Sequence, residues 1–184
     1  MVEQHYAFQA LMRLGKRSTM LRLYALLDGI QYDRALNEEL NEGCGGYSLF
    51  SLPEDKPLAF AGPWLFDVSE LPINDLAKIL EVEKKYPAVS WIISEHSALI
   101  LVQHLKSCLL VSFPSEQKGI LRFYDCRVLK LLPEFLSQEQ IEYLMKYSQQ
   151  WLFYYKDKIN YYQCDASVLN VNILDGYIYS PEVF

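Results

Sequence analysis

Continuous apolar runs alternate along the chain with segments of helical periodicity. The apolar runs at 21–29 and 88–94 predict buried strands, the first ending in an Asp-Gly turn. Amphipathic spacing predicts helices over the ranges 6–14, 32–41, 74–85 and 96–106. In the last of these helices, Leu99, Val102 and Leu105 share one face, and Ser94 or Ser97 lies near the N-cap. This alternation predicts an α/β protein whose mixed β-sheet is flanked by helices.

The rest of the chain adds shorter elements and a change of character near its end. A strand at 58–68 is interrupted at Gly62-Pro63, and the runs 108–113 and 120–125 suit an antiparallel hairpin. Ser137 and Gln140 match a capping box that opens a helix to about residue 150. We therefore expect an α/β lobe over 1–135 and a smaller helical, aromatic-rich C-terminal lobe over 136–184.

The stretch Leu121–Leu129 places several polar side chains between two apolar positions. As a strand, it would point Leu121 and Phe123 to one face of the sheet and alternate residues to the other. Asp125 would end the strand and cap a helix by accepting from the backbone N–H of residue 127 or 128, and Pro133 would stop that helix. Arg122 and Arg127 would then be free to pair with carboxylates, and Asp28 is one candidate.

Charge and cysteine usage exclude several function classes. The 184 residues carry a formal net charge of −6, and no basic cluster is longer than Lys16-Arg17, so a nucleic-acid partner is not expected. Cys44, Cys108, Cys126 and Cys164 are scattered without a C-x-x-C pair, which gives no support to a zinc site. The first residues lack the layout of a signal peptide, and the apolar runs are too short to span a membrane. We expect a cytoplasmic protein with reduced cysteines and no membrane partner.

Tyrosine is abundant, with 14 copies, and many aromatic side chains lie in the last third of the chain. Tyrosine combines a large apolar area with a polar tip, which makes it frequent both in protein cores and at interfaces. The sequence leaves both interpretations open for this region.

Patterns that signal chemistry are weak in this sequence. Ser94, Glu95 and His96 are neighbours, whereas a catalytic triad is assembled by the fold around a strained nucleophile turn, and no G-x-S-x-G occurs. His96 and His104 would lie about 12 Å apart along a helix, too far for one metal ion. The glycines at 43–46 match no nucleotide-binding pattern. We expect no cofactor and no catalytic residue, and keep a small enzyme that uses Arg122, Tyr124 and Asp125 as an alternative.

Four segments in order, LYALLDG, GPWL, WIIS with the helix after it, and LRFYDCRVLKLLP, resemble the DUF4123 family over residues 21–151. The resemblance implies a non-catalytic bacterial cytoplasmic adaptor or chaperone for a type VI secretion effector. Its implied partners are a secreted toxin effector and the VgrG or PAAR protein of the spike. The residues that carry the family motif are Asp28, Gly29, Gly62, Pro63, Trp64, Arg122, Phe123, Tyr124, Asp125 and Arg127.

One position departs from the family pattern, which usually has Asp-Pro-Arg where this chain has Cys126 between Asp125 and Arg127. Proline at the first helical position is pre-organised and sacrifices no helical hydrogen bond, so cysteine there leaves a freer backbone. A third possibility is an immunity protein that occludes the active site of a toxin. The acidic net charge suits that role, but the family resemblance does not.

Overall fold

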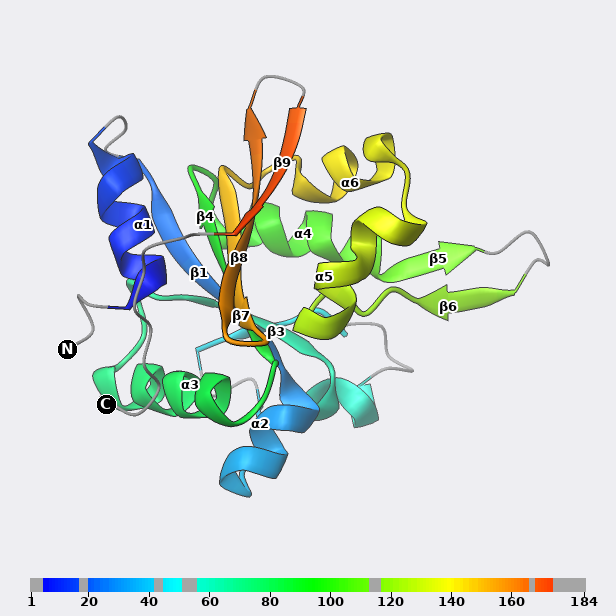
Figure 1. Ribbon diagram of the computed structural model, residues 1–184. Coiled ribbons are helices and arrows are strands. Elements are labelled where there is room, and N and C mark those ends of the chain that lie inside the picture. The colour runs from blue at the N-terminus through cyan, green and yellow to red at the C-terminus, as the bar shows by residue number, and fades with distance from the viewer. Residues whose placement is uncertain are drawn as a thin grey trace.

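The computed structural model describes residues 5–16, 20–41, 45–50, 56–112, 117–165 and 168–173. The helices in these ranges are α1 Tyr6–Gly15, α2 Gly29–Leu36, the 3₁₀ helix η3 Lys56–Ala61, α3 Ile73–Lys85, α4 Ala98–Leu109, α5 Cys126–Phe135 and α6 Gln138–Met145. The strands are β1 Arg22–Asp28, β2 Tyr47–Ser48, β3 Pro63–Asp67, β4 Val89–Ser94, β5 Leu110–Ser112, β6 Lys118–Ile120, β7 Gln150–Tyr155, β8 Lys158–Asp165 and β9 Val168–Ile173 (Figure 1).

One large sheet organises the described part of the chain. Its strand order is β2-β3-β1-β4-β7-β8-β9, and every neighbouring pair among these strands is antiparallel. The expected α/β class with flanking helices is confirmed, but the sheet is antiparallel at every described pairing, whereas a mixed sheet was predicted. Strands β5 and β6 form a separate hairpin, as predicted but with shorter strands, and it projects away from the body of the protein (Figure 1).

Strand β1 shows why the sheet is buried on both faces. Its residues from Leu23 to Asp28 are all buried, although side chains alternate between the two faces. Tyr24 and Leu26 enter one hydrophobic cluster, whereas Leu23, Ala25 and Leu27 enter the other. A continuous apolar run is therefore what a central strand with helices on both sides requires.

Two sets of helices cover the two faces. Helices α4, α5 and α6 place Leu101, Leu129 and Leu144 in the cluster on the Tyr24 side. Helices α1, α2 and α3 contribute to the opposite cluster, with Ala7 and Ile79 among its members. The resulting arrangement has a helical layer on each side of the sheet. No helix in the described ranges is long and apolar enough to cross a membrane.

The segment after residue 135, expected as a smaller lobe, contributes α6 and three strands of the main sheet. Strand β7 pairs directly with β4, so this region continues the sheet that the first half begins. Trp151, Phe153 and Tyr162 are buried in the core, whereas Tyr143 is exposed. Of the aromatic positions near the end of the chain, residues 177 and 179 lie outside the described ranges.

Helix α1 is attached to the body through a buried carboxylate on α3. Glu83 accepts hydrogen bonds from the Tyr6 hydroxyl at 2.5 Å and the Trp91 indole at 2.8 Å, and its other oxygen lies 2.7 Å from the His5 ring. Burial alone would raise the pKa of Glu83, but the contacts with His5, Tyr6 and Trp91 lower it. His104 is also buried, with its ring 3.2 Å from the Leu144 carbonyl.

The predicted strand over 120–125 is wrong beyond Ile120. Phe123 and Tyr124 are consecutive residues, yet both are buried in the same cluster, which an alternating strand does not allow. The chain turns here instead, and the Asp125 N–H donates to the Arg122 carbonyl at 3.0 Å. The expected opposition of Leu121 and Phe123 against Tyr124 is therefore replaced by a turn that buries two rings together.

Pro133 does not stop the helix as predicted, because α5 continues to Phe135. Proline lacks the N–H that would donate to the carbonyl four residues earlier, at Leu129. The Tyr162 hydroxyl of β8 donates to that carbonyl at 2.7 Å. A side chain from a distant strand thus supplies the donor that the proline cannot.

Several other boundaries differ from the predicted ones. The helix expected over 32–41 is α2, which begins at Gly29, directly after the strand, because Asp28 caps it. The strand expected over 58–68 begins only at Pro63, and the part expected before the interruption belongs to the 3₁₀ helix η3, so the prediction of strand is wrong there. The helix predicted to reach about residue 150 ends at Met145, where the chain turns into β7.

Helix α4 departs from its expected face and cap. Val102 and Leu105 are buried, but Leu99 is 60% exposed, so the predicted common face is wrong at that position. Ser97 is at the N-cap position without a side-chain hydrogen bond, and the Ser94 hydroxyl instead accepts from the His96 N–H at 3.0 Å. The capping box at Ser137 and Gln140 is confirmed.

Candidate functional site

The family-motif residues meet at one junction although they come from three parts of the sequence. Asp28, at the end of β1, accepts from the backbone N–H of Ile30 at 3.2 Å and so caps α2. Its other oxygen lies 3.0 Å from the Arg122 guanidinium, which confirms the hypothesised pairing across 94 positions. Burial raises the pKa of Asp28, and the charge of Arg122 opposes this without cancelling it.

Asp125 performs the same task for α5. One oxygen accepts from the Arg127 backbone N–H at 3.0 Å, which confirms the predicted cap. The Arg127 guanidinium also donates to both carboxylate oxygens, with Nε at 2.9 Å and Nη2 at 2.7 Å. Burial acts to raise the pKa of Asp125, but these contacts with Arg127 lower it overall.

Two glycines let backbone segments approach closely beside Asp28. The Gly29 N–H donates to the Gly62 carbonyl at 2.9 Å. A Cβ added at Gly29 would collide with the Phe60 carbonyl oxygen and lie 2.7 Å from the Gly62 oxygen. A Cβ at Gly62 would lie 2.5 Å from the Phe50 ring. Only glycine fits at Gly29, because the obstacle there is backbone that cannot rotate away.

The remaining motif residues hold the same region together. Pro63 opens β3 opposite Asp28, and its carbonyl accepts from the Leu49 N–H at 2.9 Å. The buried Trp64 indole donates to the Ala59 carbonyl at 2.8 Å. Phe123 is fully buried, with its ring centroid 6.0 Å from that of Trp151. These are structural contacts of the sheet with η3 and with the turn before α5.

The enzyme alternative depends on Arg122, Tyr124 and Asp125 acting on a substrate. Burial raises the pKa of Tyr124, so its hydroxyl is held protonated at neutral pH. Arg122 lies against the Tyr124 ring at 5.5 Å and against Asp28, while both Asp125 oxygens accept from Arg127. The three groups are thus engaged in structural contacts, and Asp125 has the predicted capping role.

Cys126 shows what the departure from proline does here. Its backbone N–H donates to the Pro87 carbonyl at 3.0 Å, and its buried thiol donates to the Val89 carbonyl at 3.2 Å. The expectation that proline would sacrifice no bond at this position is therefore wrong for this chain, because the N–H has a partner outside the helix. Burial raises the pKa of the Cys126 thiol well above its usual value, so the thiol is an unreactive structural group.

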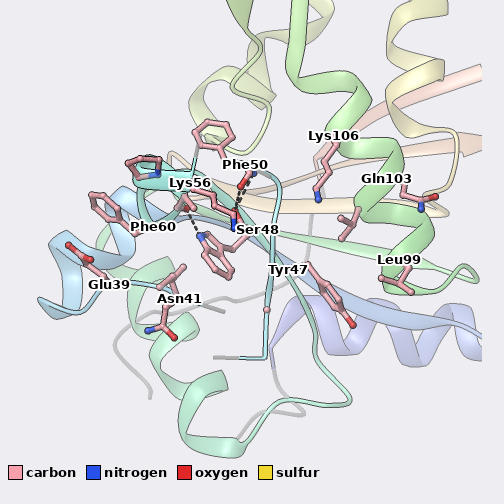
Figure 2. A pocket seen from close by; sticks show the side chains of 16 residues that line it. Glu39, Asn41, Tyr47, Ser48, Phe50, Lys56, Phe60, Leu99, Gln103 and Lys106 are labelled. Carbon is pink, nitrogen blue, oxygen red and sulfur yellow. Dashed lines mark hydrogen bonds between the residues drawn. The ribbon is translucent and has the colours of Figure 1, made fainter. Parts of the chain in front are cut away.

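Next to this junction lies a large groove that the sequence did not reveal (Figure 2). Its volume is about 660 Å³, and it runs between helix α4 and the region of β2 and η3. Figure 2 shows Leu99, Gln103 and Lys106 presented by α4, with Lys56 and Phe60 across the cavity from them. The other lining residues are Glu39, Leu40, Asn41, Gly46, Tyr47, Ser48, Phe50, Pro57, Ala59, Trp64 and Val102.

The groove has an apolar interior and a polar rim. Tyr47, Phe50 and Phe60 are half-buried, so each ring presents part of its surface. Lys56, Gln103 and Glu39 supply charged and polar groups at the edge, and Leu99 adds an exposed aliphatic side chain. Aromatic anchors surrounded by polar groups are typical of a surface that binds a protein segment. In the described ranges, no group of three histidine, cysteine or acidic residues could hold a metal ion.

Sequence reasoning missed this groove because its walls come from segments without a shared spacing. Residues 47–50, 56–60 and 99–106 meet only through the antiparallel pairing of β2 with β3 and the packing of α4. Trp64 is the one motif residue that lines it. The exposed position of Leu99, one turn from the buried Val102, is the signal that marks this wall once the buried face of α4 is known.

A comparison with family models gives one match. The model described as a domain of unknown function, DUF4123, matches residues 23–143. That range runs from β1 into α6 and contains all ten motif residues. No curated protein and no solved structure matches the chain.

Proposed function

The chain belongs to the DUF4123 family, and from this premise we propose that it is a non-catalytic adaptor for a type VI secretion effector. The adaptor binds a secreted toxin effector in the cytoplasm and assists its loading onto a VgrG or PAAR spike protein. The groove between α4 and η3 is the surface that receives a segment of the effector. The observation that carries this proposal is the half-open cavity of about 660 Å³ with three half-buried aromatic rings.

The shape and chemistry of the groove support a peptide-like occupant. A segment of extended chain or one face of a helix would place apolar side chains against Phe50 and Phe60 and remove their exposed area from water. Lys56 and Lys106 lie at the edge of the groove. Ion pairs with them would fix the position of a bound segment without burying a charge. Burying an aggregation-prone effector segment in this way would also give the adaptor its chaperone role.

The motif residues support the proposal through their position. The junction of Asp28, Gly29 and Gly62 fixes η3, which forms one wall of the groove. Trp64 links the motif residues to the groove directly. Its indole donates a hydrogen bond to the Ala59 carbonyl, and the residue also lines the cavity. We therefore assign the motif a supporting role and place the binding contacts on the neighbouring surface.

Secretion of the effector tests the proposal. In the bacterium that carries this gene, its deletion should abolish secretion of one effector, and the wild-type gene should restore it. Leu99→Glu places a charge in the groove at a side chain that is already 60% exposed, so it should leave folding intact and fail to restore secretion. Ile73→Glu is the matched control, because Ile73 is 70% exposed at the start of α3 and does not line the groove.

Co-purification with the tagged protein supplies a second readout. The wild-type protein and the Ile73→Glu variant should retain the effector whose secretion is lost, and the Leu99→Glu variant should not. Unchanged secretion of every effector after deletion would contradict the adaptor function. Neutralisation of a purified toxin without any secretion machinery would instead identify an immunity protein.

A further inference from the structure

A second cavity, of about 450 Å³, lies between α5 and the turn that joins β7 to β8. Its lining residues are Arg127, Lys130, Leu131, Tyr155, Lys156, Lys158 and Asn160. Four of these seven side chains are cationic and none is acidic, although acidic residues outnumber basic ones by 23 to 17 in the whole chain. We call these seven residues the basic cradle. Because Arg127 is paired with Asp125 and Asp157 lies in the same turn, the excess of positive charge here is carried by the three lysines.

Helix α5 provides one wall of the basic cradle. Arg127, Lys130 and Leu131 are three and four positions apart, so they lie on the same side of the helix. Arg127 is held in place by its contacts with Asp125 at 2.7 and 2.9 Å. Leu131 is 44% exposed, which adds an apolar contact beside the charges.

The turn between β7 and β8 provides the other wall. Lys156 and Asp157 both have left-handed backbone conformations, with φ of 52° and 59°, which is the conformation of a tight two-residue hairpin. The buried Asn160 amide donates to the Lys158 carbonyl at 3.0 Å, and this hydrogen bond stabilises the turn. The cationic side chains of the turn are therefore presented by a rigid element.

The lysines of the basic cradle are not paired with carboxylates in the described part of the chain. Within the described ranges, Lys130, Lys156 and Lys158 have no carboxylate within ion-pair distance. The Lys156 ammonium lies 5.4 Å from the Tyr155 ring centroid, a contact that leaves its charge intact. By contrast, Lys78 and Lys85 elsewhere on the surface are paired with glutamates at 2.6 Å.

From this concentration of charge we propose that the basic cradle binds an acidic segment of a protein partner. Carboxylates of the segment would face Lys130 and Lys158, and apolar side chains between them would contact Leu131 and Tyr155. Charge complementarity argues for this occupant, because a cationic surface attracts acidic segments and repels basic ones. The net charge of −6 disfavours a long polyanion such as nucleic acid, since most of the surface would repel it.

This inference is independent of the adaptor proposal. The basic cradle shares no lining residue with the groove between α4 and η3. A variant of one surface therefore leaves the other unchanged, and the two proposals can fail separately. If the protein is an adaptor, the basic cradle gives it a second contact with the effector or the spike protein.

Binding of labelled peptides to the full chain tests the inference. The probe is a peptide in which glutamates are interleaved with leucines, and the control peptide carries glutamine in place of each glutamate. Fluorescence anisotropy at low and moderate salt should detect binding of the glutamate peptide alone, weakening as salt screens the charges. Lys130→Gln combined with Lys158→Gln should weaken binding by roughly fivefold, the effect of losing two exposed ion pairs.

The matched control is Lys16→Gln combined with Lys118→Gln, which removes the same charge from exposed positions outside the basic cradle. Its affinity for the probe should stay near that of the wild type. Lys130→Arg combined with Lys158→Arg should retain binding, which separates lost charge from lost folding. Equal weakening in both glutamine variants, equal binding of both peptides, or no binding by the wild type would overturn the inference. Tighter binding of short duplex DNA or anionic vesicles than of the glutamate peptide would also overturn it.

Discussion

Asp28 and Asp125 perform the same local task with opposite electrostatic outcomes. Each is a buried aspartate that caps a helix with one oxygen and contacts an arginine with the other. The partner of Asp28 is Arg122, 94 positions away, and the pKa of Asp28 is raised by burial. The partner of Asp125 is two positions away, donates through two nitrogens as well as its backbone, and lowers the pKa of Asp125.

The difference shows that a cap and an ion pair do not by themselves make a carboxylate favourable in its charged form. Arg127 adds two charged donors to Asp125, which exceed the penalty of burial. Arg122 adds a single contact to Asp28, which is more deeply buried and also faces the charge of Asp125, so this contact does not offset the penalty. The local pair therefore stabilises its own helix, whereas the distant pair joins the end of β1 to the turn before α5 at some electrostatic cost.

The largest expected effect lies at the first residue of each capped helix. Gly29→Ala should lower the free energy of unfolding by about 3 kcal/mol, because the added Cβ meets two backbone carbonyls. Gly15→Ala is the matched control and should cost little, since no heavy atom lies within 4 Å of its added Cβ. Urea denaturation measures both values. Equal values for the two variants would mean that the backbone beside Asp28 yields easily.

The corresponding position after Asp125 is Cys126, and Cys126→Pro should destabilise the protein although proline suits the start of a helix. The substitution removes the N–H that donates to the Pro87 carbonyl and leaves that acceptor without its partner, at a cost of about 2 kcal/mol. Cys126→Ala keeps the N–H and loses only the thiol contact, so it should cost less. Thermal and urea unfolding should rank the variants in this order. A proline variant at least as stable as the wild type would show that the Pro87 contact is dispensable.

Replacing each aspartate by asparagine compares the two charges directly. Asparagine caps a helix about as well as aspartate, so the substitution mainly removes the charge. At pH 7, Asp125→Asn should destabilise the protein by about 0.5 kcal/mol more than Asp28→Asn, since only the Asp125 charge is favoured by its surroundings. Urea midpoints of the two variants, measured side by side, give the difference. The reverse order would refute the contrast between the two carboxylates.

The smallest expected effect is in the acid dependence of stability. The lowered pKa of Asp125 stabilises the folded state above the unfolded pKa of about 3.9, and this contribution is lost as pH falls through the lower folded value. The raised pKa of Asp28 acts oppositely, because protonation in the folded state relieves a penalty as pH falls. Asp125→Asn should therefore flatten the loss of stability in acid by a few tenths of a kcal/mol, and Asp28→Asn should steepen it. Urea midpoints between pH 7 and the onset of acid unfolding test both slopes.

The parts of this arrangement that depend on neighbouring residues could be predicted from the sequence. The Asp125 cap follows from an aspartate before an apolar helical segment, and the capping box at Ser137 follows from its glutamine three positions later. The Asp28–Arg122 pair could be named as one candidate because Asp28 ends an apolar run and Arg122 has no part in the predicted helix cap. Buried strands such as β1 and β4 were recognised because a strand covered on both faces is apolar throughout.

The parts that depend on tertiary contacts could not be predicted in the same way. Nothing local shows that Cys126 bonds to Pro87, or that Phe123 and Tyr124 turn together into the core. The groove is hidden for the same reason, since its aromatic rings belong to segments that become neighbours only after β2 joins β3. A hydrophobic pattern indicates which face of an element is buried, whereas these sites form where several elements meet.

The hydroxyl of Tyr162 that serves the Leu129 carbonyl has a consequence for the emerging polypeptide during translation. Helix α5 contains Pro133, so its hydrogen bonding is completed only when β8 has docked on the sheet. While Tyr162 is still inside the ribosome, every residue of α5 has been synthesised, but the Leu129 carbonyl still lacks the hydroxyl that donates to it. Helix α5 therefore gains this hydrogen bond only after β8 has been synthesised and has paired with β7.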